Sequence, residues 1–195
     1  MSTTNEVRRR PGGRSARVRS AVFTATLEVL AEAGAAGLTI AEVAKRAGVH
    51  ETSIYRRWST RERLAVEALS ELSAELLPTP DTGTLEGDLV ALGRSLAEYG
   101  QSPLGRALMR TFALSDDEEA IGAARAEFWQ ARFDECSLLV TRAITRGELP
   151  EGTDERRLLE SFVAPIHFRI LMTRQAIDQL FLEQLAETTG KAFTA

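Results

Sequence analysis

The sequence has little of what several common classes of protein require. Cys136 is the only cysteine among 195 residues, so an intrachain disulfide and the cysteine-rich metal sites are excluded. The two histidines, His50 and His167, lie far apart in the chain, and we expect no metal site. No apolar run approaches the ~18 residues that cross a bilayer, and no apolar signal core follows the basic N-terminus. These absences predict a protein of the reducing cytoplasm with no membrane partner.

Patterns that carry catalysis are also scarce. The carboxylate run at residues 116–119 fits the start of a helix, where negative charge is favourable, better than it fits general acid/base chemistry. Gly12 and Gly13 are too short a signal for a phosphate-binding loop, and a lone Cys136 on an apolar face is typical of inert core. No Ser/His/Asp or Cys/His set has a suggestive spacing. We therefore expect neither enzyme activity nor a cofactor.

The charges of the chain are unevenly distributed. Residues 1–66 hold 12 Lys and Arg against 6 Asp and Glu, whereas residues 67–195 hold 12 against 22. The basic N-terminal part could attract a polyanion while the acidic remainder keeps the protein soluble. A basic face that is merely solvated explains the same numbers equally well, so charge alone does not decide between them.

Helical periodicity is what the sequence has in abundance, and strand signals are poor. Residues 39–42 and 59–62 read as capping boxes, in which a hydroxyl accepts from an amide three residues on and the glutamate reaches back. Gly34 and Gly48 follow apolar helical stretches and can end them. The proline and glycine residues at 78–83 break the chain and mark the best domain boundary.

The stretch GVHETSIYRRW at residues 48–58 predicts a helix-turn-helix. Ala44 suits a close helix crossing, Gly48 suits the turn, and Ile54 provides the apolar plug. The N-terminus of such a second helix enters the major groove of DNA. The side chains expected to reach base edges are His50, Glu51, Thr52 and Ser53. The side chains spaced to meet phosphates are Tyr55, Arg56, Arg57 and Arg61. For Glu51 we favour capping of the helix over acceptance of a hydrogen bond from cytosine.

Residues 15–66 resemble the DNA-binding domain of the tetracycline-repressor (TetR) family. The resemblance lies in LTIAEVAKRAGV at residues 38–49 and SIYRRWSTRERL at residues 53–64. It implies that Thr39, Tyr55, Arg57 and Arg61 contact phosphates and that Trp58 belongs to the core. Arg57 stands where the family commonly has His, and His50 and Glu51 depart from its commoner residues at the turn. Before this domain, a flexible basic arm at residues 1–14 could enter the minor groove or remain a disordered tail. Its basic side chains are Arg8, Arg9, Arg10 and Arg14.

The C-terminal part is similar to one C-terminal type of the same family, through residues 146–173 and the amphipathic segment that follows them. The resemblance implies that helices at about 154–173 and 178–191 pair with those of a second subunit in a four-helix interface. Their apolar faces exceed what a peripheral helix pair usually carries, although an ordinary monomer core remains the alternative. Pro165 should kink the first helix. The expected interface residues are Leu158, Phe162, Ile166, Ile170, Phe181, Leu182 and Leu185.

Members of this family often sense a small molecule in the C-terminal body. Aromatic and other large side chains at helical spacing could line such a cavity here, although plain core packing explains the same pattern. The candidates are Tyr99, Met109, Phe112, Phe128, Trp129, Phe133, Phe162, His167 and Met172.

The sequence therefore predicts an all-α fold of about nine helices. We expect a DNA-binding domain at residues 15–66 with a three-helix helix-turn-helix, and a helical bundle for ligand sensing and dimerisation at residues 67–195. The predicted function is a homodimeric transcriptional repressor on a pseudo-palindromic DNA operator, released by a small-molecule effector. The alternatives are a regulator of the same kind without an effector and a small helical enzyme with a basic surface.

Overall fold

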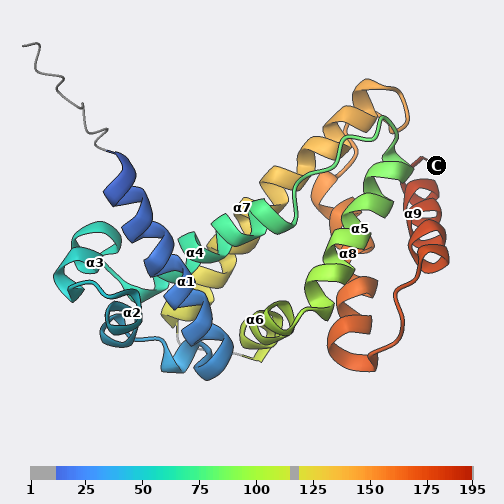
Figure 1. Ribbon diagram of the computed structural model, residues 1–195. Coiled ribbons are helices and arrows are strands. Elements are labelled where there is room, and N and C mark those ends of the chain that lie inside the picture. The colour runs from blue at the N-terminus through green and yellow to red at the C-terminus, as the bar shows by residue number, and fades with distance from the viewer. Residues whose placement is uncertain (1–11, 115–118, 195) are drawn as a thin grey trace, which may run out of the picture.

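The computed structural model describes residues 12–114 and 119–194 (Figure 1). Within these two ranges the chain forms nine α-helices and one π-helical turn, without any strand, which confirms the prediction of an all-α protein. The elements are α1 (Gly12–Gly37), α2 (Ile40–Ala47), α3 (Glu51–Trp58), α4 (Arg61–Leu76), α5 (Leu85–Gln101), α6 (Pro103–Leu114), α7 (Glu119–Thr145), α8 (Glu155–Phe168), η1 (Arg169–Thr173) and α9 (Gln179–Thr194). No helix in the described part is long and apolar enough to cross a membrane.

The turn between α2 and α3 is built from the residues that the sequence marked. The hydroxyl of Thr39 accepts a hydrogen bond from the amide of Glu42 at 3.2 Å and so caps α2. Gly48 ends α2 in the left-handed conformation, with φ of 65°, where a side chain would be strained. The amide of Val49 donates to the carbonyl of Ala44 at 3.0 Å, which completes the C-terminal cap.

Three local predictions differ from the structure. Glu42 does not reach back to the start of α2, because its carboxylate pairs with Arg46 at 2.8 Å. The cap of α4 is Thr60 rather than Ser59, which ends α3 instead, and because Arg63 stands three residues after Thr60, the second capping box does not form. Gly34 interrupts α1 with φ of 69°, yet helical residues continue to Gly37. The first difference has a clear physical reason, because a hydrogen bond between the Glu42 carboxylate and a charged arginine is stronger than one to a neutral backbone amide.

The C-terminal helices begin at short polar side chains. Ser102 accepts from the amide of Gly105 at 2.9 Å ahead of Pro103, as the sequence predicted for α6. Asp154 caps α8 and Asp178 caps α9, each by accepting from an amide three residues on at 2.9 Å. The helix that was expected to run to residue 173 ends at Phe168 and passes into the wider turn η1.

The buried apolar residues form two clusters. The first, here called the head core, unites α1, α2, α3 and the first half of α4 around Ile54 and Trp58, and it includes Leu108 of α6. The second, the body core, joins α5, α7, α8 and α9 around Leu89, Leu139 and Phe162. Figure 1 shows the head at one side of the molecule and the body at the other, with α4 and α7 running between them.

Helix α4 leads from the head core to the body core. Leu64 and Leu69 lie in the head core, whereas Leu77, directly after the end of α4, lies in the body core. The boundary predicted at residue 66 therefore falls inside this helix. Because α4 starts only three residues after α3, a displacement of its C-terminal end would be transmitted to the helix-turn-helix.

Candidate nucleic-acid interface and ligand cavity

Helix α3 is held on the head by its apolar face. Ile54 and Trp58 are fully buried, and the Trp58 ring lies 5.6 Å from that of Phe23. The indole Nε1 of Trp58 donates to Glu67 at 2.9 Å, so its polar atom is satisfied. This anchoring fixes the orientation of α3 and leaves its polar side free.

The opposite side of α3 is exposed to solvent. Four residues at its start were expected to meet base edges, and of these only Ser53 is half-buried. The exposed members of the predicted set are His50, Glu51, Thr52, Tyr55, Arg56 and Arg57. An exposed polar face at the N-terminus of a short helix is the arrangement that major-groove recognition requires.

Glu51 does not form the cap that we favoured from the sequence. The N-cap residue of α3 is His50, and its side chain makes no capping hydrogen bond. Glu51 is the first residue of the helix, where its charge is favourable to the helix dipole without a directed bond. Its predicted contact with a base stays a prediction.

The residues expected to contact phosphates differ in how they are held. Arg57 donates to the Ser15 hydroxyl at 3.3 Å and stacks over the Trp58 ring at 5.2 Å, so it is presented from the surface of the head. Arg61 donates to the carbonyl of Leu38 at 3.2 Å and to Glu62 at 2.7 Å. Thr39 and Tyr55 are exposed. Arg61 thus already has structural partners, whereas Arg57 needs to give up only one neutral bond to reach DNA.

The predicted basic arm falls almost wholly beyond the described part of the chain. Arg8, Arg9 and Arg10 lie outside the described residues, and so does the side chain of Arg14. Helix α1 begins at Gly12, which is three residues earlier than the sequence predicted. The role of the arm stays a prediction.

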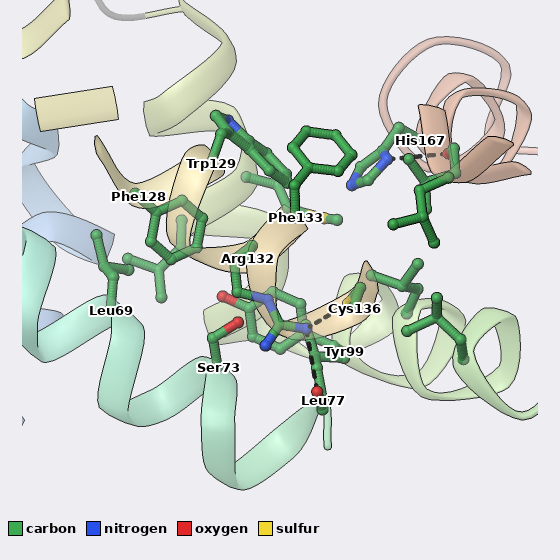
Figure 2. Close-up of a pocket in the computed structure, with 16 residues that line it drawn as sticks. Leu69, Ser73, Leu77, Tyr99, Phe128, Trp129, Arg132, Phe133, Cys136 and His167 are labelled. Carbon is green, nitrogen blue, oxygen red and sulfur yellow. Dashed lines mark hydrogen bonds between the residues drawn. The ribbon is translucent and has the colours of Figure 1, made fainter. Parts of the chain in front are cut away.

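A cavity of about 90 Å³ lies between the head core and the body core (Figure 2). Leu69 and Leu108 of the head core line it, and so do Leu77 and Leu159 of the body core. Six of the residues predicted for a ligand pocket meet on its wall. They are Tyr99, Met109, Phe128, Trp129, Phe133 and His167.

Three other predicted pocket residues are not brought to this wall. Phe162 is fully buried in the body core, and Met172 is 72% exposed on η1. The side chain of Phe112 lies outside the described part of the chain. Phe162 and Met172 are therefore corrections: large apolar side chains on one stretch of helix serve the core, the cavity and the surface alike.

The sequence analysis missed Arg132 and Cys136 as residues of the cavity wall. A signal for them was present, because residues 128, 132 and 136 follow one another at the four-residue spacing that places side chains on one helical face. Arg132 donates to Glu135 at 2.5 Å, to the carbonyl of Leu77 at 3.1 Å and to the sulfur of Cys136 at 3.5 Å. Arg132 therefore joins the cavity wall on α7 to the C-terminal end of α4.

Burial favours the uncharged forms of Tyr99, Cys136 and His167 on the cavity wall. Burial raises the pKa of Tyr99 to about 12 and raises the pKa of the Cys136 thiol. Burial also lowers the pKa of His167, against a smaller opposing effect of its hydrogen bond to the Val163 carbonyl. At neutral pH the wall therefore presents a neutral phenol, thiol and imidazole.

Most of the predicted interface residues are buried within the single subunit. Leu158, Phe162 and Ile166 are 0% exposed, and Leu182 is 2% exposed, so none of these four can contact another chain in this conformation. Ile170, Phe181 and Leu185 are half-buried against the body core. The face of α8 and α9 that the sequence assigned to a partner is thus the face turned to α5 and α7, because a stripe strong enough for an interface is equally strong enough for a core.

The same elements carry large apolar side chains on their outer side. Phe168 is 56% exposed, and Leu180 on α9 is 62% exposed. Met172 on η1 is exposed as well, and we call these three exposed side chains the outer apolar face. In residues 12–114 and 119–194 no group of three His, Cys, Asp or Glu side chains is arranged to hold a metal ion.

Two family profiles match the chain. The profile described as "Tetracyclin repressor-like, C-terminal domain" matches residues 79–189, and the profile described as "Bacterial regulatory proteins, tetR family" matches residues 22–68. The chain belongs to the TetR family. The resemblance that residues 15–66 suggested is thereby confirmed.

Other TetR-family proteins match over most of the chain. The HTH-type transcriptional regulator AqdR of Rhodococcus erythropolis is 35% identical over 157 residues, which are 80% of this chain and 76% of that protein. The HTH-type transcriptional regulator YdeS of Bacillus subtilis (strain 168) is 27% identical over 176 residues, which are 90% of this chain and 89% of the relative. This chain is accordingly a DNA-binding transcriptional regulator of the helix-turn-helix class.

Solved TetR-family structures share the arrangement of the helices. The regulator SCO0332 superposes with a TM-score of 0.73 at 25% identity, over 90% of this chain and 97% of that chain. FadR from Bacillus subtilis, solved in complex with stearoyl-CoA, superposes with a TM-score of 0.63 over 90% of this chain and 97% of that chain. Its identity to this chain is 18%, so the likeness to FadR shows the fold alone.

Proposed function

We propose that the protein is a repressor that binds a pseudo-palindromic operator as a homodimer and is released by a small-molecule effector. The observation that carries the effector part is the position of the cavity. Residues of the head core and residues of the body core line it together, and α4 contributes Leu69 and Ser73 to its wall. A ligand bound there would contact the helix that leads directly to the helix-turn-helix.

DNA recognition in this proposal uses the exposed side of α3. Glu51 and Thr52 stand at the N-terminus of the helix, where side chains reach base edges. Tyr55, Arg56 and Arg57 follow and would hold phosphates, which position the protein without reading sequence. Bacterial operators lie in the cytoplasm, so the protein would act there, as a regulator without enzyme activity.

Dimerisation in this proposal uses the outer apolar face in place of the buried stripe expected from the sequence. Phe168 and Met172 are four residues apart and both project to solvent in the single subunit. Leu180 adds a third large side chain from the start of α9. A second copy would cover this face, and the two-fold axis would place two α3 helices for two half-sites about 34–36 Å apart or at a multiple of that distance.

The size of the cavity supports the proposed release by a ligand. A cavity of about 90 Å³ is smaller than the roughly 150 Å³ that accommodates benzene, so a larger ligand must displace part of the wall. Arg132 ties the wall to the end of α4, and a displaced α4 would change the separation of the two heads. The ligand would act through its higher affinity for the displaced state.

The test is a mobility shift on genomic DNA fragments retained by the purified protein. The retained fragments should share an inverted repeat, and Thr52→Ala should relax the preference at one base pair in each half-site while its binding to unrelated DNA stays unchanged. Arg156→Ala, on the exposed side of α8, is the matched control and should bind as wild type does. Fragments without a two-fold repeat would contradict the homodimer, and an operator complex that no cavity ligand dissociates would favour a regulator without an effector.

A further inference from the structure

The side chain of His167 presents one free nitrogen to the cavity. Its Nδ1 lies 3.0 Å from the carbonyl oxygen of Val163. A carbonyl can only accept, so Nδ1 carries the proton, and in the neutral ring Nε2 is then a hydrogen-bond acceptor. Within the described part of the chain, the contact of Nδ1 is the one hydrogen bond that the His167 ring makes, and Nε2 makes none. Figure 2 shows this nitrogen directed away from the α8 backbone and into the group of lining side chains.

The orientation of the imidazole is fixed by its neighbours. The Trp129 ring packs edge to face against it, with centroids 5.8 Å apart at 85°. The bond to the Val163 carbonyl holds the opposite side of the ring. A ring that is held on two sides offers its acceptor in one direction, which is the condition for recognising one polar group of a ligand.

Among the residues that the structure describes, the cavity wall offers no uncompensated positive charge to an anion. Arg132 is the cation on its wall, and its guanidinium already pairs with the Glu135 carboxylate at 2.5 Å. The rest of the wall is apolar or neutral, including Tyr99 and Cys136. A carboxylate that entered would lose its hydration and find a partner only by breaking the Arg132–Glu135 pair.

We propose that this cavity selects an uncharged, mainly apolar ligand whose polar group donates a hydrogen bond to Nε2 of His167. The inference rests on the proposed function, in which the cavity is the effector site. It assigns His167 as a specificity-determining residue and names the chemistry of the ligand: a phenol, an alcohol or a ring N–H on an apolar body.

Three matched probes test the selectivity: 4-propylphenol, 4-propylanisole and 4-propylbenzoate. They share an apolar propylphenyl body. The phenol offers a hydrogen-bond donor, the anisole offers an oxygen without a donor, and the benzoate carries a negative charge. Isothermal titration calorimetry of the full chain at pH 8 should show the phenol binding about 2- to 12-fold more tightly than the anisole, which is one net hydrogen bond. The benzoate should bind roughly 100-fold more weakly than the phenol, or not measurably.

Two variants locate the acceptor. His167→Phe keeps a flat ring against Trp129 but removes the nitrogen, so the phenol and the anisole should bind it equally. Tyr99→Phe removes another neutral polar group of the wall and should keep the preference for the phenol. The proposal is overturned if the preference survives in His167→Phe or is lost only in Tyr99→Phe. It is equally overturned if the benzoate binds best, or if none of the three probes binds wild type.

The closing measurement separates this proposal from the proposed function. Operator binding without any probe tests the DNA-binding regulator, and calorimetry without DNA tests the cavity. If the phenol binds with the expected selectivity but leaves the operator complex intact, the assignment of His167 stands and release by an effector fails. If no operator is bound at all, the repressor proposal fails while the selectivity can still be measured.

Discussion

The head and the body use their tryptophans in opposite ways. Trp58 is 1% exposed, contacts Phe23 and donates to Glu67, so the head core is closed around it. Trp129 is half-buried on the wall of a cavity, between Phe128, Phe133 and His167. The difference indicates a rigid unit that presents α3 and a second unit that has room to rearrange, which is the division of labour that ligand-controlled DNA binding requires.

The helices differ in the same sense. In the head, α2 and α3 have eight residues each, and each buries a single apolar face. In the body, α7 has 27 residues with apolar side chains turned to the core at Leu139, to the cavity at Phe133 and to solvent at Leu138. A short helix has one environment, whereas a long helix passes through several.

The largest effect should come from exchanging the two tryptophans for alanine. Trp58→Ala should lower the free energy of unfolding by about 3–5 kcal/mol, because it leaves a cavity in a closed core and removes the hydrogen bond to Glu67. Trp129→Ala should cost less than about 2 kcal/mol, since its side chain is only half-buried next to existing space. Urea denaturation followed by circular dichroism measures both. Equal losses would remove the distinction between a closed head and an adaptable body.

The second effect concerns the two exposed sides of the body. Phe168→Glu should cost roughly 2–4 kcal/mol of association free energy, because a two-fold contact buries the introduced charge twice. Leu138→Glu is the matched control, since Leu138 is 50% exposed on α7 and lies outside the outer apolar face. Sedimentation equilibrium should show monomers for the first variant and wild-type behaviour for the second. Dissociation by Leu138→Glu alone would place the contact on α7.

A smaller effect should separate two arginines of the head. Arg57→Ala should weaken binding to every duplex alike and reduce the slope of log affinity against log salt by about one unit, as expected for one phosphate contact. Arg61→Ala should instead lower the free energy of unfolding by about 1–2 kcal/mol, because its bonds to Leu38 and Glu62 are lost. Mobility shifts at several salt concentrations and thermal melting distinguish the two roles. A change in salt slope for Arg61→Ala with unchanged melting would return it to the phosphate contacts.

The sequence predicted the head better than the body for a physical reason. Thr39, Gly48 and Ile54 each satisfy a local demand, namely a cap, a left-handed turn and a buried plug, and local demands can be read from neighbouring residues. The cap of α4 shows where such prediction ends. Ser59 and Thr60 both offer a hydroxyl that can cap the helix, and the geometry of the chain decides that Thr60 does so.

In the body, the fold class and most helix boundaries could be predicted, but not the direction in which each apolar face points. Phe162 and Phe168 are six residues apart on α8, and one is buried while the other is 56% exposed. Their side chains have the same chemistry, so only the packing of α5, α7 and α9 against α8 separates core from surface. Arg132 was missed because a charged residue was not expected on an apolar wall, where the Leu77 carbonyl and Glu135 make it tolerable.

The smallest expected effect concerns His167 on the cavity wall of the body. It arises from the difference in the pKa of His167 between the folded and the unfolded chain. Burial lowers its pKa in the folded body below the ordinary value of 6.5, so the folded state favours the neutral ring. The stability that depends on a neutral His167 is therefore fully present above about pH 6.5 and is lost as the pH falls from there through the lowered pKa. Of the other groups at the wall, Arg132 pairs with the half-exposed Glu135, and burial raises the pKa values of Tyr99 and of the Cys136 thiol, away from this range. Thermal melting between pH 8 and pH 5 should thus show a decline in stability for wild type that is smaller in His167→Phe. Subtracting the two profiles removes the contributions of all groups that both proteins contain. Parallel declines would mean that protonation of His167 costs the fold nothing, and that the body accommodates a charge on this wall as readily as the solvent does.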